Sequence, residues 1–273
     1  MSAAIGIDAG TSLVKLAIEH PSGDLQLENF ARDAHTELAE RVAALAPETV
    51  GLTGGGAVTI QRFLGRPSTV LNEFSAWAAG AKRLLSVTEA QPERYLLVSL
   101  GTGTSIQKID GDEAVRVGGT ALGGGAMFGL GRLLTGAADF ASFCELAARG
   151  SRGAVDLMLS DVYPEGEVPL AADMTAASFG KLAWDPSLQP DPADAAAGIV
   201  QLVAENIGLL IGQAAVAHDT RIIRIGGSTL SGSPLLATTL TRLLSAFGCD
   251  ARVLEDGAYT GAVGAIELVR DPA

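Results

Sequence analysis

Hydrophobic residues recur along the chain in two groups of three short runs, and polar turns separate the runs within each group. The runs occupy residues 3–8, 13–19 and 24–30 in the first group, and residues 95–100, 105–110 and 114–118 in the second. Runs of this length, bounded by glycine, serine and aspartate, are typical of antiparallel strands joined by tight turns. Two such trios predict an α/β fold whose basic unit is used twice along the chain.

Apolar residues at helical spacing follow each trio of strands. The helices that this spacing predicts lie at residues 36–45, 72–85, 123–134, 140–148, 193–217, 235–247 and 259–268. Further strands are expected at residues 49–53, 221–225 and 251–254. The segment 150–192 holds five of the 11 prolines and is expected to be irregular, with a short helix near residues 175–181. We expect two lobes, residues 1–90 and 91–273.

Composition narrows the class of protein. Of the 273 residues, 48% are hydrophobic, which argues against a disordered chain. The net charge of −12 disfavours a broad basic surface for nucleic acid, although a local basic site for an anionic ligand stays open. The longest apolar stretch, residues 199–218, contains Gln201, Glu205 and Asn206, so we expect a core helix and no membrane span.

The two cysteines and the first residues of the chain bear on its location. Cys144 and Cys249 lie far apart without metal-ligand spacing, which favours reduced, buried thiols and a cytoplasmic setting. The first residues read as a strand without a basic segment before it, so no signal peptide is expected.

Two tight turns are rich in glycine and hydroxyl groups. One joins the strands at 95–100 and 105–110 and contains Gly101, Thr102 and Gly103, with Thr104 and Ser105 beside it. The other, at Gly10, Thr11 and Ser12, joins the first two strands of the chain and follows Asp8. Exposed backbone N–H groups and hydroxyls suit an oxyanion, so the pair predicts a phosphate held between two related halves.

These features resemble the actin, hexokinase and Hsp70 ATPase superfamily, whose duplicated ribonuclease H-like fold has an ATP cleft between two lobes. Within it, several motifs resemble the type II (eukaryotic-like) pantothenate kinases. They are Asp8-Ala-Gly with Lys15, Asn72-Glu-Phe, residues 100–105, Arg116-Val-Gly-Gly with the triple glycine 123–125, and residues 259–265. The sequence departs from the family pattern at two places. Thr11 stands where the family usually has glycine. After Gly226-Gly227-Ser228 the family often has an asparagine and an aromatic residue, and this chain continues with Thr-Leu-Ser instead.

The resemblance implies transfer of a phosphoryl group from MgATP to pantothenate, the first step of coenzyme A biosynthesis, by a homodimer. Glu73 would be the general base, although an acidic residue after the helix cap Asn72 also has a purely structural explanation. Lys15 would stabilise charge on the transferred group. Arg116, with Thr104 and Ser105, would bind the substrate carboxylate, the alternative for Arg116 being a surface pair with an aspartate of the preceding turn.

The remaining implied roles concern ATP and its metal. Asp8 would face Mg²⁺ through water. The phosphate and nucleotide contacts would come from Asp8, Gly10, Thr11, Ser12, Lys15, Gly101, Thr102, Gly103, Thr120, Gly123, Gly124, Gly125, Gly226 and Gly227. The triple glycine is expected to open a helix with free N–H groups. Close packing is the alternative there, and a plain turn is the alternative at 226–227.

Other functional classes fit less well. The sequence contains no P-loop, no Gly-x-Gly-x-x-Gly motif and no Gly-x-Ser-x-Gly elbow, and its three histidines are scattered. A kinase of another small alcohol, such as pantetheine or an amino sugar, stays an alternative. So does an ATP-hydrolysing sensor or activator, which would not need Glu73.

Overall fold

Two five-stranded sheets form the framework of the protein in a computed structural model, which describes residues 4–88, 92–164, 167, 171 and 173–270. The first sheet contains β1 (Ala4–Ala9), β2 (Leu13–Glu19), β3 (Leu25–Ala31), β4 (Thr49–Thr53) and β5 (Thr69–Val70). The second contains β6 (Arg94–Leu100), β7 (Thr104–Asp110), β8 (Glu113–Thr120), β11 (Ile222–Gly226) and β12 (Asp250–Val253). The strand orders are β3-β2-β1-β4-β5 and β12-β11-β6-β7-β8.

Read from their antiparallel edges, the two sheets have the same order. An antiparallel trio is followed by two strands that are parallel to the first strand of the trio. The predicted duplication of an α/β unit is therefore present, and the predicted strands agree with the observed ones to within one or two residues. The division into lobes at residue 90 stays a prediction.

Helices cover the first sheet on one face with a small separate core. The apolar residues of α1 (His35–Leu45) and α2 (Ala57–Leu64), among them Leu38, Val42 and Ile60, pack against the buried strands β1, β2 and β4. Sequence patterning did not predict α2. It begins directly after the glycines 54–56, which follow the predicted strand β4.

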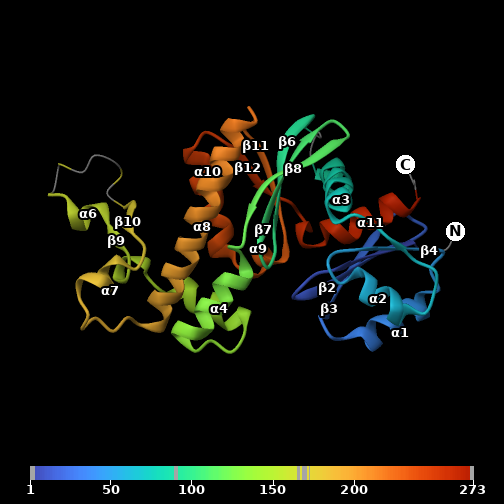
Figure 1. Ribbon diagram of the computed structural model, residues 1–273, viewed down its shortest axis with the longest axis horizontal. Helices are drawn as coiled ribbons and strands as arrows, with labels where there is room; N and C mark the ends of the chain where they lie inside the picture. Colours follow the sequence, from blue (N-terminus) through green and yellow to red (C-terminus); the bar gives the residue numbers. More distant parts are fainter. Residues whose placement is uncertain (1–3, 89–91, 165–166, 168–170, 172, 271–273) are drawn as a thin grey trace.

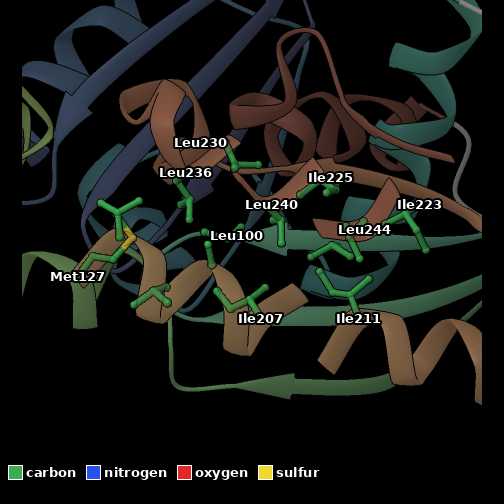
Figure 2. Packing of buried hydrophobic residues seen from close by; sticks show 14 of the residues in the cluster. Leu100, Met127, Ile207, Ile211, Ile223, Ile225, Leu230, Leu236, Leu240 and Leu244 are labelled. Atoms are coloured by element: carbon green, nitrogen blue, oxygen red, sulfur yellow. The ribbon is translucent and has the colours of Figure 1, made fainter. Parts of the chain in front are cut away.

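The largest core lies between the second sheet and α8 (Pro192–Ala217), α10 (Pro234–Ala246) and α4 (Gly124–Thr135). Figure 2 shows Ile207 and Ile211 of α8 facing Leu240 and Leu244 of α10, with Leu100 at the end of β6. Among the described helices, α8 alone is long and apolar enough to span a membrane, but most of its apolar window is buried within the molecule. It is the core helix that the sequence predicts.

The C-terminal helix α11 (Thr260–Arg270) lies against the first sheet and α3 (Glu73–Thr88) (Figure 1). Glycines make this close approach possible. A Cβ on Gly6 or Gly51 of the sheet would overlap carbonyl oxygens of α11, and a Cβ on Gly264 would overlap the carbonyl of Ala76 in α3. The last element of the chain is thus packed into the half of the molecule formed by its first residues.

The described residues of the segment 150–191 form an arm at the end of the molecule away from the first sheet (Figure 1). It contains η1 (Arg152–Ala154), β9 (Leu157–Met158), α6 (Leu159–Val162), β10 (Thr175–Ala177) and α7 (Gly180–Trp184). The predicted short helix at 175–181 is wrong for its first residues, which pair with β9. The Thr175 hydroxyl donates to Glu205 and accepts from Arg152, and these contacts hold the segment extended.

Candidate active site

The two predicted phosphate turns meet at a cavity of about 370 Å³ between the sheets. The turn between β1 and β2 and the turn between β6 and β7 both line it, and the hydroxyls of Ser12 and Thr102 are hydrogen-bonded to each other at 2.9 Å. Residues of the sequence-predicted set that line the cavity are Asp8, Gly10, Thr11, Ser12, Lys15, Glu73, Gly101, Thr102, Gly103, Thr104, Ser105, Arg116, Thr120 and Gly227. Turns from both sheets therefore face one space.

Asp8 and Lys15 lie directly opposite each other on β1 and β2. Both side chains are buried, and the Lys15 Nζ lies 3.9 Å from Asp8 Oδ2. Burial raises the pKa of Asp8 to about 6, the charge of Lys15 lowers it, and the negative Glu73 nearby raises it. Protein groups alone therefore compensate the negative charge of the Asp8 carboxylate only weakly.

A hard divalent cation fits this environment. No cluster of three or more His, Cys, Asp or Glu side chains exists among the residues with described positions, so protein groups alone do not form a metal cage. One buried carboxylate with little compensation suits an ion that keeps water and phosphate oxygens as its other ligands, as Mg²⁺ does. Gly54 and Gly261 border this carboxylate, since a Cβ on either would lie within 3 Å of one of its oxygens.

Glu73 is the first residue of α3 and lines the same cavity. The side chain of Asn72 caps the helix, because its Oδ1 accepts from the N–H groups of Phe74 and Ser75 at 2.9 and 3.2 Å. Capping is therefore done by Asn72, and the carboxylate of Glu73 is available for chemistry. It is close enough to Asp8 to affect the pKa of that group.

Arg116 reaches the cavity from β8 as an exposed side chain. The aspartates of the preceding turn have other partners: Asp110 pairs with Arg94 and Lys108, and Asp112 pairs with Lys82. Arg116 has no ion pair with any residue of described position, so neither aspartate forms the surface pair that was the alternative for it.

Hydroxyl groups complete the wall beside Arg116. The buried Oγ of Ser105 has no hydrogen-bond partner among the described groups, and Ser105 lies opposite Ser99 in the sheet register. The hydroxyl of Thr104 donates to the carbonyl of Leu122 at 2.8 Å, which leaves it only as an acceptor. Ser105 is therefore the freer of the two predicted substrate contacts.

The triple glycine does not line the cavity. The prediction that its N–H groups are free is wrong for two of the three residues. Gly124 and Gly125 donate to the carbonyls of Gly101 and Thr102, at 2.9 and 3.0 Å. A Cβ on Gly123 would lie 2.8 Å from the Gly101 carbonyl oxygen. These glycines pack α4 against the second phosphate turn, which is the alternative explanation that the sequence left open.

The glycines after β11 have different surroundings. Gly227 lines the cavity with a φ of 123°, a conformation that favours glycine. Gly226 does not line it, and instead contacts Trp77 and Gly257, since a Cβ there would lie 3.1 Å from the indole and 2.7 Å from the Gly257 carbonyl oxygen. A backbone pressed against protein groups accounts for Gly226.

Sequence reasoning missed six residues that line the cavity: Gly55, Phe74, Trp77, Ser99, Ser228 and Ala258. Trp77 follows Glu73 by one helical turn, so it shares the face of α3 on which Glu73 lies. Ser99 precedes the second turn by two residues. Helical and strand periodicity from Glu73 and Ser105 could have found these two residues, whereas Gly55 and Ala258 carry no such signal.

Comparisons with known proteins identify the family. Residues 24–267 match the family model described as Fumble. The type II pantothenate kinase of Staphylococcus haemolyticus is 33% identical over 267 residues, covering 97% of this chain and 99% of that protein. The type II pantothenate kinase of Oceanobacillus iheyensis is 34% identical over 264 residues, covering 96% and 98%. The chain belongs to the type II pantothenate kinase family.

Similar solved structures confirm the actin-like ATPase fold of this type II pantothenate kinase family member. An activator of the 2-hydroxyisocaproyl-CoA dehydratase from Clostridium difficile, with bound ADPNP, has a TM-score of 0.68 at 16% identity, covering 99% of this chain and 95% of that one. A ROK family glucokinase from Streptomyces griseus, in complex with glucose and AMPPNP, has a TM-score of 0.61 at 16% identity, covering 98% and 99%. At this identity the likeness shows the fold alone.

Proposed function

We propose that this protein is a pantothenate kinase, which transfers the γ-phosphoryl group of ATP to the primary hydroxyl of pantothenate and forms 4′-phosphopantothenate. The family membership supports the reaction. The observation that carries the proposal for the site is that Glu73 and Arg116 line one cavity together with both phosphate turns. A carboxylate base and a carboxylate-binding guanidinium thus face the same space as the groups that would hold the nucleotide.

The proposed reaction transfers one phosphoryl group and one proton. The hydroxyl oxygen of pantothenate attacks the γ-phosphorus as the bond from that phosphorus to the β,γ-bridging oxygen breaks, and ADP leaves. Glu73 accepts the hydroxyl proton, which is the ordinary role of a carboxylate in alcohol phosphorylation. Lys15 stabilises negative charge on the transferred group as a fixed positive charge on β2.

The acceptor end of the cavity suits a substrate with a carboxylate. The guanidinium of Arg116 can donate two parallel hydrogen bonds to such a group. Ser105 offers its unpartnered hydroxyl to the same substrate, and Thr104 contributes an acceptor oxygen and contact surface. A neutral acceptor such as pantetheine would leave the guanidinium without its partner.

The nucleotide end uses both turns. Backbone N–H and hydroxyl groups of residues 10–12 and 101–103 would bind the phosphates, with Thr120 and Gly227 at the border of the same space. Asp8 would hold Mg²⁺ through water. When bound, the ion neutralises charge on the phosphates and so assists their orientation.

We also propose a cytoplasmic homodimer. An apolar groove of about 420 Å³ lies where the C-terminal part of α8 meets Phe247, and it is bordered by Leu209, Gly212 and Val216. Leu209, Val216 and Phe247 are each more than 40% exposed, which is a cost that a second copy would remove.

The two cysteines support the cytoplasmic location. Both are free thiols, and cysteines stay reduced in the cytoplasm.

An acceptor panel tests the proposal. Purified protein is incubated with MgATP and pantothenate, pantetheine or an amino sugar, and the phosphorylated products are identified by mass spectrometry. We expect 4′-phosphopantothenate, with pantothenate the preferred acceptor. Phosphorylation of another acceptor alone would favour a different small-alcohol kinase, and ADP without any phosphorylated acceptor would favour an ATP-hydrolysing sensor.

A further inference from the structure

We infer that Gly119 is a positioning residue that seats the guanidinium of Arg116 and thereby makes the acceptor site selective for a carboxylate. The inference rests on the proposed function, because it concerns how the same site distinguishes pantothenate from a neutral acceptor. Three observations on β7 and β8 carry it: a β-bulge, the close approach of the guanidinium to the backbone of Gly119, and the lack of another partner for Arg116 among the described residues.

The bulge brings Arg116 and Gly119 to one face of the sheet. In the register of β7 with β8, Ser105 pairs with Gly119, Ile106 with Gly118, and Gln107 with Arg116, so Val117 is the extra residue. Residues three apart in a regular strand lie on opposite faces. The extra residue reverses this relation, and Arg116 lies on the same face as Gly119 and Ser105.

The guanidinium then lies against the backbone of Gly119. A Cβ on this glycine would be 2.6 Å from Arg116 Nη2, 2.6 Å from the carbonyl oxygen of Thr104, and 3.4 Å from the Cα of Ser105. The space that a side chain would occupy at position 119 is therefore bordered by the guanidinium on one side and by the Thr104 carbonyl on the other, and the φ of 157° at this position itself favours glycine. It lies next to Ser105, whose buried hydroxyl has no partner among the described groups.

Nothing else described in the structure holds the guanidinium. Arg116 makes no ion pair with the residues of known position, and the nearby aspartates are paired with other cations. An arginine side chain that is free to move must lose rotamer freedom when it binds, and this loss weakens binding. A seat formed by the backbone reduces that loss without neutralising the charge, so the guanidinium keeps its capacity for a substrate carboxylate.

Gly119→Ala tests the seat, and Gly118→Ala is the control for an added methyl group on the same strand. The backbone strain at the φ of 157° of Gly119, which position 118 lacks, is separated by the double-mutant cycle below. Position 118 is the neighbouring glycine of the same strand, and a Cβ there would meet only the side chain of Ile106, at 3.8 Å. For Gly119→Ala we expect the KM for pantothenate to rise by about 10-fold or more with kcat changed by less than about 2-fold, as for loss of ground-state binding. The KM for the neutral alcohol analogue of pantothenate and the affinity for ATP should change by much less than the KM for pantothenate. Gly118→Ala should resemble the wild type in all of these.

A double-mutant cycle separates this role from a general disturbance of the turn. In an Arg116→Ala background, Gly119→Ala should raise the KM for pantothenate by clearly less than in the wild-type background, because only the backbone strain at position 119 and the overlap with the Thr104 carbonyl remain. An equal additional loss in that background, or a Gly119→Ala variant that behaves like Gly118→Ala, would overturn the inference. If Arg116→Ala itself leaves the KM for pantothenate unchanged, the proposed carboxylate contact fails instead.

A measurement on the wild-type protein covers the case in which Gly119→Ala does not fold. The ¹⁵N side-chain resonances of Arg116, assigned by comparison with Arg116→Ala, report whether the guanidinium is ordered. The seat predicts restricted rotation before pantothenate is added. Free rotation in the absence of substrate, becoming restricted only on its addition, would contradict the inference.

Discussion

Asp8 shows how a single residue combines a functional role with a cost in stability. Its carboxylate is buried at the end of β1, and burial outweighs the favourable charge of Lys15, so its pKa rises to about 6. A group whose pKa is higher in the folded protein than in the unfolded chain binds its proton more tightly when folded. The ionised form therefore destabilises the fold at neutral pH until a cation compensates its charge.

This shift predicts a pH-dependent difference between the wild type and Asp8→Asn. Asp8 contributes favourably below about pH 4, and the contribution is lost as the pH rises from its ordinary value of 3.8 to about 6. The free energy of unfolding of Asp8→Asn relative to the wild type should thus increase over this range, by up to about 3 kcal/mol, and stay constant above pH 7. Denaturant titrations of the nucleotide-free proteins at pH 4, 5, 6 and 7 measure it. A relative stability that does not change with pH would show that Asp8 is not shifted.

Residue types and their order along the chain were enough to nominate most of the residues that line the cavity. Asp8, Glu73 and Arg116 stand in recognisable motifs, and the structure brings all three to one space. What the sequence could not provide is the partner of each group. The N–H groups of Gly124 and Gly125 looked free in a helix start, but they donate to carbonyls of the second turn, which lies earlier in the chain.

At the scale of elements, glycines decide how closely α11 and α3 approach. A Cβ on Gly264 would overlap the Ala76 carbonyl of α3, and one on Gly80 would overlap the Thr260 carbonyl of α11. Each of the two glycines thus lies against a backbone carbonyl of the opposite helix. This crossing lies behind the site, since α3 begins at Glu73 and α11 contacts Asp8 through Gly261.

Gly264→Ala should therefore destabilise the protein although alanine is the better helix former. Overpacking of this kind costs about 1–3 kcal/mol or more. Gly129 in α4 is the matched control, because it is exposed in the middle of a helix and a Cβ there would meet no atom within 4 Å. Gly129→Ala should raise the free energy of unfolding by up to about 1 kcal/mol. Chemical denaturation measures the change in the free energy of unfolding for both variants. Changes of opposite sign support the account, and an increase in both variants would contradict it.

Elements with a clear period were predictable from the sequence, and short elements were not. Alternation and helical spacing gave β2, β4 and α8 almost to the residue. The helix α9 (Ser228–Gly232) follows a glycine-rich turn and is too short for a distinct pattern. In α2 the core-facing residues Ala57, Ile60 and Leu64 do stand at helical spacing, but over only two turns after the glycines. The bulge in β8 has no periodic signature either, because it depends on how the strand pairs with β7.

The whole molecule repeats one strand order in two sheets, and the phosphate turns are equivalent parts of the two repeats. Sequence similarity between the halves is slight, yet the repetition was predictable from the two strand trios. The position of α11 was not predictable in this way. It is the last helix of the chain but packs on the first sheet, through contacts with β1 and β4 that are far apart in sequence.

The proposed homodimer is a prediction at this scale. Light scattering should give twice the 27.8 kDa mass of one chain. Val216→Glu places a charge in the apolar groove at the end of α8 and should shift the mass towards that of one chain. Val87→Glu is the control, since Val87 is an exposed valine of α3, outside the residues that line the groove. A dimer unaffected by Val216→Glu would place the interface elsewhere, and a monomeric wild type would remove the proposal.

The most direct test of the central claim is the rate of 4′-phosphopantothenate formation by the wild type and by Glu73→Gln, measured with labelled pantothenate and MgATP. The account predicts product from the wild type and a fall in kcat of about 10²-fold or more in the variant, with ATP affinity preserved, because the variant lacks the group that accepts the hydroxyl proton. Full activity of Glu73→Gln, or a wild type that binds ATP and forms no 4′-phosphopantothenate, would contradict it.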